Sequence, residues 1–142
     1  MMVVIDTPVW SLALRRTPSD LKPEQERLKR ELAELIREGR TRMLAPIRQE
    51  ILSGIREETQ FRRLREYLRA FEDEPLTTED YEGAAHANNQ CLRAGVAGST
   101  IDFLICALAM RRSWAIFTSD RDFTRYAKHL SIQLYTPRPT KQ

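Results

Sequence analysis

The hydrophobic residues of this chain follow two alternating patterns: short apolar blocks and longer runs with a helical period. Four short blocks, at residues 3–6, 42–45, 114–119 and 131–136, are flanked by polar residues or turn signals. The first block opens with three consecutive β-branched residues, which is typical of a buried strand. All four blocks are shorter than an ordinary helix, so we predict a strand at each.

Between these blocks, apolar residues recur at the spacing of one helix face. In residues 24–38, Leu28, Leu32, Leu35 and Ile36 stand at positions i, i+4, i+7 and i+8, and Gly39 follows as a stop signal. Residues 99–112 are apolar almost all round, which is typical of a helix that is buried on every side. Similar patterns predict helices from Pro46 to about Gly54, over residues 57–72, from Thr77 or Thr78 to about Arg93, and over residues 120–130.

The predicted strands alternate with the predicted helices along the chain. Such alternation is typical of βαβ units, in which parallel strands form a sheet that helices cover on both faces. We therefore expect an α/β fold with a central parallel sheet. The chain has no repeat and no internal linker, so we expect residues 1–136 to form one domain, followed by a loose, proline-bearing tail at residues 137–142.

Composition places the chain among globular proteins. Hydrophobic residues make up 42% and charged residues 30% of its 142 residues, a composition too apolar for a disordered protein. It contains no apolar run long enough to cross a membrane. The apolar N-terminal stretch is too short for a signal peptide and lacks a basic start. We therefore expect a cytoplasmic protein with no membrane partner.

The two cysteines, Cys91 and Cys106, stand in apolar helical contexts without C-x-x-C spacing. Because structural disulfides are rare in the cytoplasm, we expect both to be buried free thiols. The only histidines, His86 and His129, form no metal-ligand motif with them, which disfavours a zinc site.

The basic residues are mostly arginines. The net charge is +3, and only four of the 23 basic residues are lysines. The planar guanidinium group suits phosphate contacts better than an ammonium group does, so this bias favours a nucleic-acid partner. Genome composition or a preference for surface ion pairs accounts for it equally well, so the bias alone does not decide.

Acidic residues stand at the junctions between predicted strands and helices. Asp6 ends the first strand, Glu50 lies in the first turns of the helix after the second, and Asp120 follows the third, with Asp122 two residues on. Asp102 lies at the start of the predicted buried helix. In a parallel sheet, the carboxyl ends of the strands and the following helix starts share one edge. We therefore predict that these separated acids converge.

Taken singly, each acid has a structural interpretation. Asp6 and Asp120 are suited to capping turns or helices, Ser99 and Asp102 resemble a capping box, and Glu50 suits a helix dipole. Taken together, carboxylates at one edge repel each other by roughly 1 kcal/mol per pair at 4 Å even in water. A divalent cation relieves that repulsion, and an all-oxygen site suits Mg²⁺ or Mn²⁺. The pattern therefore favours a metal site.

Four sequence blocks carry a family resemblance. "VVIDTPVW", "IRQEILSG", "STIDFLICALA" and "FTSDRDF" resemble, in order, the motif blocks of PIN-domain ribonucleases, and more narrowly those of VapC toxins of toxin–antitoxin systems. Pro8 and Pro46 depart from the usual pattern, but neither replaces an acid. The resemblance implies a PIN-like α/β/α sandwich, a homodimer and a small VapB-like antitoxin as partner. It also implies an acidic quartet for Mg²⁺ or Mn²⁺ formed by Asp6, Glu50, Asp102 and Asp120, a further acid at Asp122, and supporting hydroxyls at Thr7 and Thr118.

The expected activity is that of a Mg²⁺- or Mn²⁺-dependent endoribonuclease, a hydrolase in which a metal-activated water attacks the phosphodiester. We expect Arg15, Arg48 and Arg121 to contact the RNA backbone. Two histidines in unremarkable positions disfavour a metal-free acid–base mechanism. The alternative is a PIN-domain nuclease that acts on other RNA, or on DNA, without an antitoxin. A nucleotide-binding protein is disfavoured because neither a P-loop nor a G-x-G-x-x-G motif is present.

Overall fold

Within residues 1–15 and 17–139, which the computed structural model describes, the chain forms a four-stranded parallel sheet. The order across the sheet is β2-β1-β3-β4, so β1 and β3 lie at the centre. Ile5 pairs with Phe117, which brings the carboxyl ends of the two central strands together. The predicted α/β class with a parallel sheet is confirmed. The strands are β1 (Val3–Ile5), β2 (Thr41–Arg42), β3 (Ala115–Phe117) and β4 (Gln133–Leu134).

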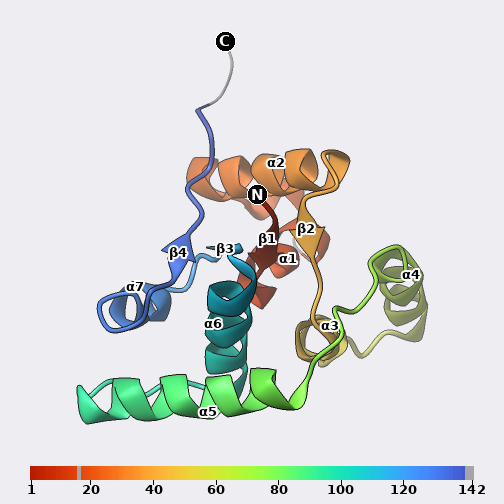
Figure 1. The fold of residues 1–142 in the computed structure, drawn as a ribbon. Coiled ribbons are helices and arrows are strands. Elements are labelled where there is room, and N and C mark those ends of the chain that lie inside the picture. Colours follow the sequence, from red (N-terminus) through yellow and green to blue (C-terminus); the bar gives the residue numbers. More distant parts are fainter. Residues whose placement is uncertain (16, 140–142) are drawn as a thin grey trace.

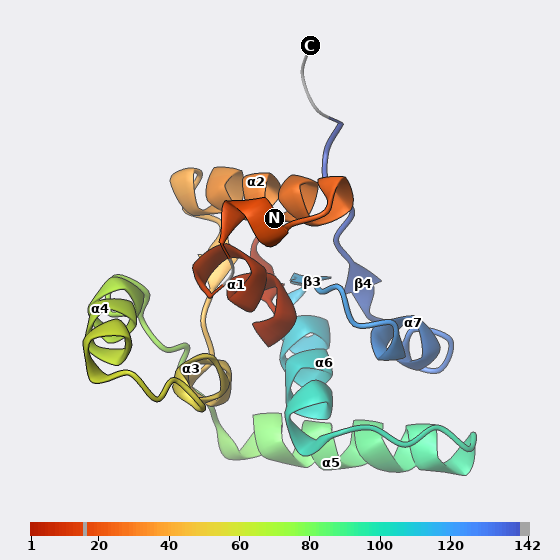
Figure 2. The ribbon, with the colours of Figure 1, turned by 180° about the vertical axis from the view of Figure 1, so that it is seen from behind.

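Helices flank this sheet (Figures 1 and 2). The first helix lies behind β1 in Figure 1 and in front of it in Figure 2, and it packs against the second and third. The sixth helix contacts strand β3 and the fifth helix. The fifth helix crosses beneath the sixth in both views. The helices are α1 (Thr7–Leu14), α2 (Pro23–Arg37), α3 (Ala45–Leu52), α4 (Glu58–Leu68), α5 (Thr78–Arg93), α6 (Thr100–Arg112) and α7 (Asp122–Tyr126), with a short 3-10 helix, η1 (Pro18–Asp20), between α1 and α2.

Several predicted boundaries were wrong. The second strand occupies Thr41–Arg42 instead of residues 42–45, because α3 already begins at Ala45 with Pro46 in its first turn. The predicted helices over residues 57–72 and 120–130 are shorter, Glu58–Leu68 and Asp122–Tyr126. The last two strands are also shorter than their apolar blocks. Pairing in this sheet extends over only two or three residues per strand, so apolar residues beyond the ladder pack as loops.

Helix α1 was missing from the prediction. Its sequence, "TPVWSLAL", is largely apolar and lacks the polar positions that reveal a helical period. Its start signals are nevertheless present, because Asp6 is its N-cap and Pro8 lies in the first turn. Val9 and Trp10 are fully buried, so the helix is stabilised by packing against the sheet and its neighbours.

Helix α6 provides much of the core, as its uniformly apolar sequence predicted. Every residue from Phe103 to Ala109 is buried. Burying a large apolar side chain stabilises a fold by roughly 1.5–3 kcal/mol, so α6 is held firmly against β3 and α5. The predicted state of Cys91 and Cys106 is also confirmed, since both are buried free thiols. The acid at the start of α6 therefore projects from a rigid support.

The C-terminal segment runs past α2 (Figure 1). Arg138 forms ion pairs with Glu31 at 2.7 Å and with Glu38 at 2.8 Å. Residues 137–139 of the predicted loose tail thus include Arg138, which is paired with α2. Residues 140–142 lie outside the described part of the chain. None of the described helices has both the length and the apolar character needed to cross a bilayer.

Candidate metal centre

Asp6 lies where β1 passes into α1, and the residue is only 4% exposed. Its Oδ1 accepts a hydrogen bond from the backbone N–H of Thr7 at 2.9 Å. Its Oδ2 accepts one from the hydroxyl of Thr118 at 2.7 Å. The capping interpretation of this residue is therefore correct in part, but the cap also places a buried carboxylate beside the end of β3.

Thr118 connects two acids at the ends of the central strands. While its hydroxyl donates to Asp6, the same oxygen accepts the backbone N–H of Asp120 at 3.0 Å. Asp120 in turn accepts the N–H of Asp122 at 2.9 Å through Oδ1. These three bonds order the loop between β3 and α7 and hold its acids near Asp6.

Asp102 reaches the same region from the first turn of α6. Its backbone N–H donates to Ser99 Oγ at 3.1 Å, so Ser99 is the N-cap of the helix. Its carboxylate Oδ2 accepts a hydrogen bond from the hydroxyl of Tyr126 at 2.7 Å. The residue therefore both belongs to a capped helix start and presents a carboxylate towards α7.

The structure brings three of the predicted acids into one cluster. Asp102, Asp120 and Asp122 each offer a carboxylate oxygen, and these oxygens lie within 4.8 Å of one another. The donor set is all oxygen and carries three formal negative charges, which suits Mg²⁺ or Mn²⁺ and not a soft metal. The residues present therefore fit a hard divalent cation. Asp122 is more central than the sequence suggested.

Two acids at this edge of the sheet have raised pKa values, which means that their charged forms are disfavoured there. Burial raises the pKa of Asp6 to about 6, against hydrogen bonds from Thr118 and Thr7 that lower it, and the charges of Asp102 and Asp120 raise it further. Burial likewise raises the pKa of Asp102, while the hydroxyl of Tyr126 lowers it. Charge is thus held here at a free-energy cost that a cation would relieve.

Glu50 lies at the periphery of the site. It is exposed on α3, and its Oε1 accepts the hydroxyl hydrogen of Thr7 at 2.8 Å. Thr7 also donates its backbone N–H to Asp6, so it joins the β1 acid to the α3 acid. Neither Glu50 nor Asp6 belongs to the cluster of three carboxylates.

The three arginines that the sequence singled out have different environments. Arg48 is bound within the fold: its guanidinium donates to Asp73 Oδ1 at 2.9 Å, to the carbonyl of Leu68 at 2.8 Å and to the carbonyl of Phe71. By contrast, Arg15 at the C-cap of α1 and Arg121 beside Asp120 are exposed. Arg48 is therefore the least suited of the three to a phosphate contact.

Two residues at the site were not found from the sequence. Tyr126 binds Asp102, and Arg125 pairs with Asp122 at 2.5 Å. The i, i+3 spacing of Asp122 and Arg125 was a readable signal for their ion pair. For Tyr126 no such signal exists, because its partner is 24 residues away on another helix.

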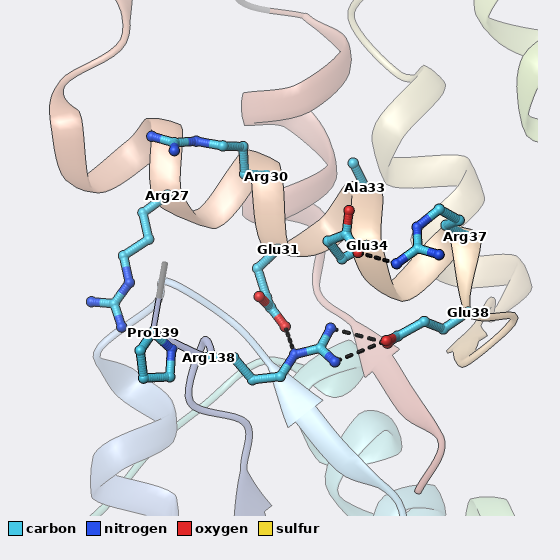
Figure 3. Close-up of a pocket in the computed structure, with 9 residues that line it drawn as sticks. All are labelled: Arg27, Arg30, Glu31, Ala33, Glu34, Arg37, Glu38, Arg138 and Pro139. Carbon is cyan, nitrogen blue, oxygen red and sulfur yellow. Dashed lines mark hydrogen bonds and ion pairs between the residues drawn. The ribbon is translucent and has the colours of Figure 1, made fainter. Parts of the chain in front are cut away.

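A separate cavity of about 420 Å³ lies along α2 (Figure 3). Its charged groups largely pair with one another: Arg138 binds Glu31 and Glu38, and Arg37 binds Glu34. None of the clustered acids lines it. The cavity is therefore distinct from the candidate metal centre.

Comparisons with known proteins agree with this architecture. A sequence model of the PIN domain matches residues 3–129. Comparison with curated protein sequences finds no match. Among solved structures, FitAcB from Neisseria gonorrhoeae is similar with a TM-score of 0.74, 22% identity and coverage of 96% of this chain and 98% of that one.

Two further structures share the fold. VapBC2 from Rickettsia felis, bound to a DNA fragment from its promoter, has a TM-score of 0.71 at 13% identity. The matched region covers 95% of this chain and 98% of the VapBC2 chain. A toxin–antitoxin complex from Klebsiella pneumoniae has a TM-score of 0.58 at 18% identity, with coverage of 85% and 89%. At these identities the likeness concerns the fold.

Proposed function

The chain belongs to the PIN domain family, and from that premise we propose that it is a Mg²⁺- or Mn²⁺-dependent endoribonuclease, the toxin of a type II toxin–antitoxin pair. The observation that carries the proposal is the convergence of Asp102, Asp120 and Asp122, whose carboxylate oxygens lie within 4.8 Å. A protein that used these acids only as helix caps has no need to bring them together.

The acids have graded roles. Asp6, Asp102 and Asp120 would hold the cation, with Asp122 as a further ligand. Glu50 is a ligand or orients the attacking water. When bound, Mg²⁺ or Mn²⁺ lowers the pKa of water and neutralises charge that develops on the phosphate.

The threonines position these acids. Thr118 holds Asp6 and the backbone of Asp120 in a fixed relation, and Thr7 does the same for Asp6 and Glu50. Oriented ligands lose less conformational freedom when a cation binds, which strengthens binding. These contacts support Thr7 and Thr118 as part of the site.

RNA binding rests on exposed arginines. Arg121 lies between two site acids in the chain and is exposed, which suits a contact to the RNA phosphate backbone. Arg15 is also exposed. Arg48 leaves the proposed set of RNA contacts because the fold already uses its guanidinium.

The antitoxin proposal is supported by the similar structures, which include a toxin–antitoxin complex and VapBC2 bound to promoter DNA. We propose that this chain likewise has a small antitoxin partner and forms a homodimer. A small gene overlapping the start of this one, encoding a DNA-binding protein, would support the pairing. Its copurification with this chain would test it directly.

The nuclease proposal is tested by incubating the purified protein with total RNA in Mg²⁺, in Mn²⁺ and in EDTA, beside Asp102→Asn. We expect cleavage with either metal and none in EDTA or with the variant. Cleavage that persists unchanged in EDTA or in the variant contradicts the metal mechanism. Single-stranded and duplex DNA in parallel reactions separate a ribonuclease from the alternative, a PIN nuclease that acts on DNA.

A further inference from the structure

Among the described residues, the hydroxyl of Tyr126 donates the one side-chain hydrogen bond that the Asp102 carboxylate accepts from α7. It donates to Asp102 Oδ2 at 2.7 Å, a normal length for a hydrogen bond between a hydroxyl and a carboxylate. Asp102 lies on α6, so this bond connects two helices at the metal centre. The chemistry of one ligand is therefore coupled to the position of a tyrosine.

The Tyr126 ring is held in place by aromatic neighbours. The side chain is 0% exposed, and its ring centroid lies 5.0 Å from that of Phe103 and 5.2 Å from that of Phe123. Phe103 directly follows Asp102, so the same turn of α6 supplies both the proposed ligand and one of the rings that pack against Tyr126. A ring packed between two others presents its hydroxyl in one place only.

Gly98 supplies the space for that hydroxyl. A Cβ atom at this position would lie 2.3 Å from the Tyr126 oxygen, 2.7 Å from Cζ and 2.9 Å from Phe103 Cε2. These distances are far below van der Waals contact, so any larger residue forces the ring to move. Gly98 also directly precedes Ser99, the N-cap of α6, so the loop cannot easily shift away.

We propose that Tyr126 is a positioning residue for the metal centre: its hydroxyl, seated against Gly98, orients the Asp102 carboxylate for cation binding. This inference rests on the proposed function. Metal ligands are commonly oriented by groups in a second layer, and loss of such a group lowers metal affinity or activity by roughly 10- to 100-fold.

A tyrosine is suited to this task because its hydroxyl is a neutral donor. It fixes the direction of a carboxylate while leaving the negative charge available to the cation. The neighbouring pair shows the contrast: Arg125 binds Asp122 with a full positive charge that competes with a cation. Asp102 is thus oriented by a neutral donor and Asp122 by a charged one, so Asp102 keeps more of its charge for a cation.

The test is a Mn²⁺ titration of the full-length protein, followed by calorimetry and by the electron paramagnetic resonance signal of free Mn²⁺. The variants are Tyr126→Phe and the matched control Tyr135→Phe, which removes a hydroxyl that binds Glu31 on α2 at 2.5 Å. We expect Tyr126→Phe to raise the Mn²⁺ dissociation constant on the order of tenfold while its circular dichroism stays unchanged. Tyr135→Phe should bind Mn²⁺ as the native protein does.

Gly98→Ala provides a second line. The added methyl group displaces the Tyr126 hydroxyl without removing it, so Mn²⁺ affinity should fall as in Tyr126→Phe. In the Tyr126→Phe background, Gly98→Ala should lower the Mn²⁺ affinity by less than it does in the native protein. The reason is that both changes break the same contact, the hydrogen bond from Tyr126 to Asp102. Equal effects of Gly98→Ala in the two backgrounds contradict the seating of the hydroxyl.

The outcomes separate this inference from the proposed function. If the native protein binds Mn²⁺ and cleaves RNA but Tyr126→Phe binds Mn²⁺ equally well, the positioning role of Tyr126 is wrong and the nuclease proposal stands. If Tyr126→Phe weakens Mn²⁺ binding but the native protein, with Mn²⁺ bound, leaves RNA intact, the positioning role stands and the nuclease proposal fails. If the native protein binds no Mn²⁺, both are overturned.

Discussion

Thr118 donates its hydroxyl hydrogen to Asp6 across 2.7 Å, although 112 residues separate the two in the chain. The bond joins the carboxyl ends of the two central strands. Because the same oxygen accepts the N–H of Asp120, a single threonine sets the distance between two proposed metal ligands. The geometry of the site thus depends on the pairing of β1 with β3.

Replacing Thr118 by valine removes this hydroxyl at nearly constant shape. Asp6 and the N–H of Asp120 then lose a partner, and we expect the free energy of unfolding to fall by roughly 1–3 kcal/mol. Nuclease activity should fall at least tenfold, as for other groups that orient metal ligands. Urea unfolding and RNA cleavage measure the two effects. Thr124→Val, which removes an exposed hydroxyl bound to the carbonyl of Arg121, is the control and should change neither by much.

Asp6→Asn should abolish cleavage while leaving the metal-free fold at least as stable at neutral pH. The pKa of Asp6 is raised from 3.8 to about 6, so the native state holds its charge at a cost of roughly 3 kcal/mol. Urea unfolding of both proteins without metal, at pH 7.5, measures the difference. A clear loss of stability in the variant means that capping α1 is the main role of Asp6.

The same shift predicts a dependence on pH. Because the folded pKa exceeds the unfolded value, the native state binds more protons between pH 3.8 and about 6, and the Asp6 contribution to stability falls as pH rises through that window. The native protein without metal should therefore gain stability relative to Asp6→Asn as the pH is lowered from 7 to 5. Parallel thermal scans of the two proteins isolate this contribution from all other titrating groups. A constant difference between them contradicts the raised pKa.

Divalent cations should stabilise the native protein. A ligand that binds only the folded state adds about 2.7 kcal/mol at a concentration 100 times its dissociation constant. We expect the thermal midpoint to rise with Mn²⁺ or Mg²⁺ and to return to its starting value with EDTA. Asp120→Asn should abolish most of the rise, whereas Asp20→Asn on η1, which is not one of the clustered acids, should preserve it. A rise that survives Asp120→Asn places the cation elsewhere.

Arg48 and Arg121 should respond differently to truncation. Arg48→Ala breaks bonds to Asp73 and to two backbone carbonyls, so we expect it to lower the free energy of unfolding by about 2 kcal/mol or more. Arg121→Ala should leave stability unchanged but weaken RNA binding, with a smaller dependence of affinity on salt. Fluorescence anisotropy measures the binding, with Asp102→Asn as the background because this variant is expected not to cleave the RNA. Equal RNA affinity with and without Arg121 removes it from the substrate contacts.

The sequence by itself determined the class of the fold, and it singled out the acids on which the proposed metal site rests. Alternating apolar blocks and helical periods imply a parallel sheet, since local periodicity reports directly which faces of an element are buried. It also revealed α5, whose start at Thr78 follows from a local capping box of Thr77 and Asp80. Helix α1 escaped detection because its burial leaves too few polar positions to show a period.

Only the tertiary structure decided how the acids are related to each other. The clustering of Asp122 with Asp102 and Asp120, and the removal of Glu50 to the periphery, depend on how α3, α6 and the β3–α7 loop pack on the sheet. The bonds from Thr118 to Asp6 and from Tyr126 to Asp102 join residues that are distant in the chain. Local sequence patterns carry no information about such pairs, because packing of the whole core sets their distance.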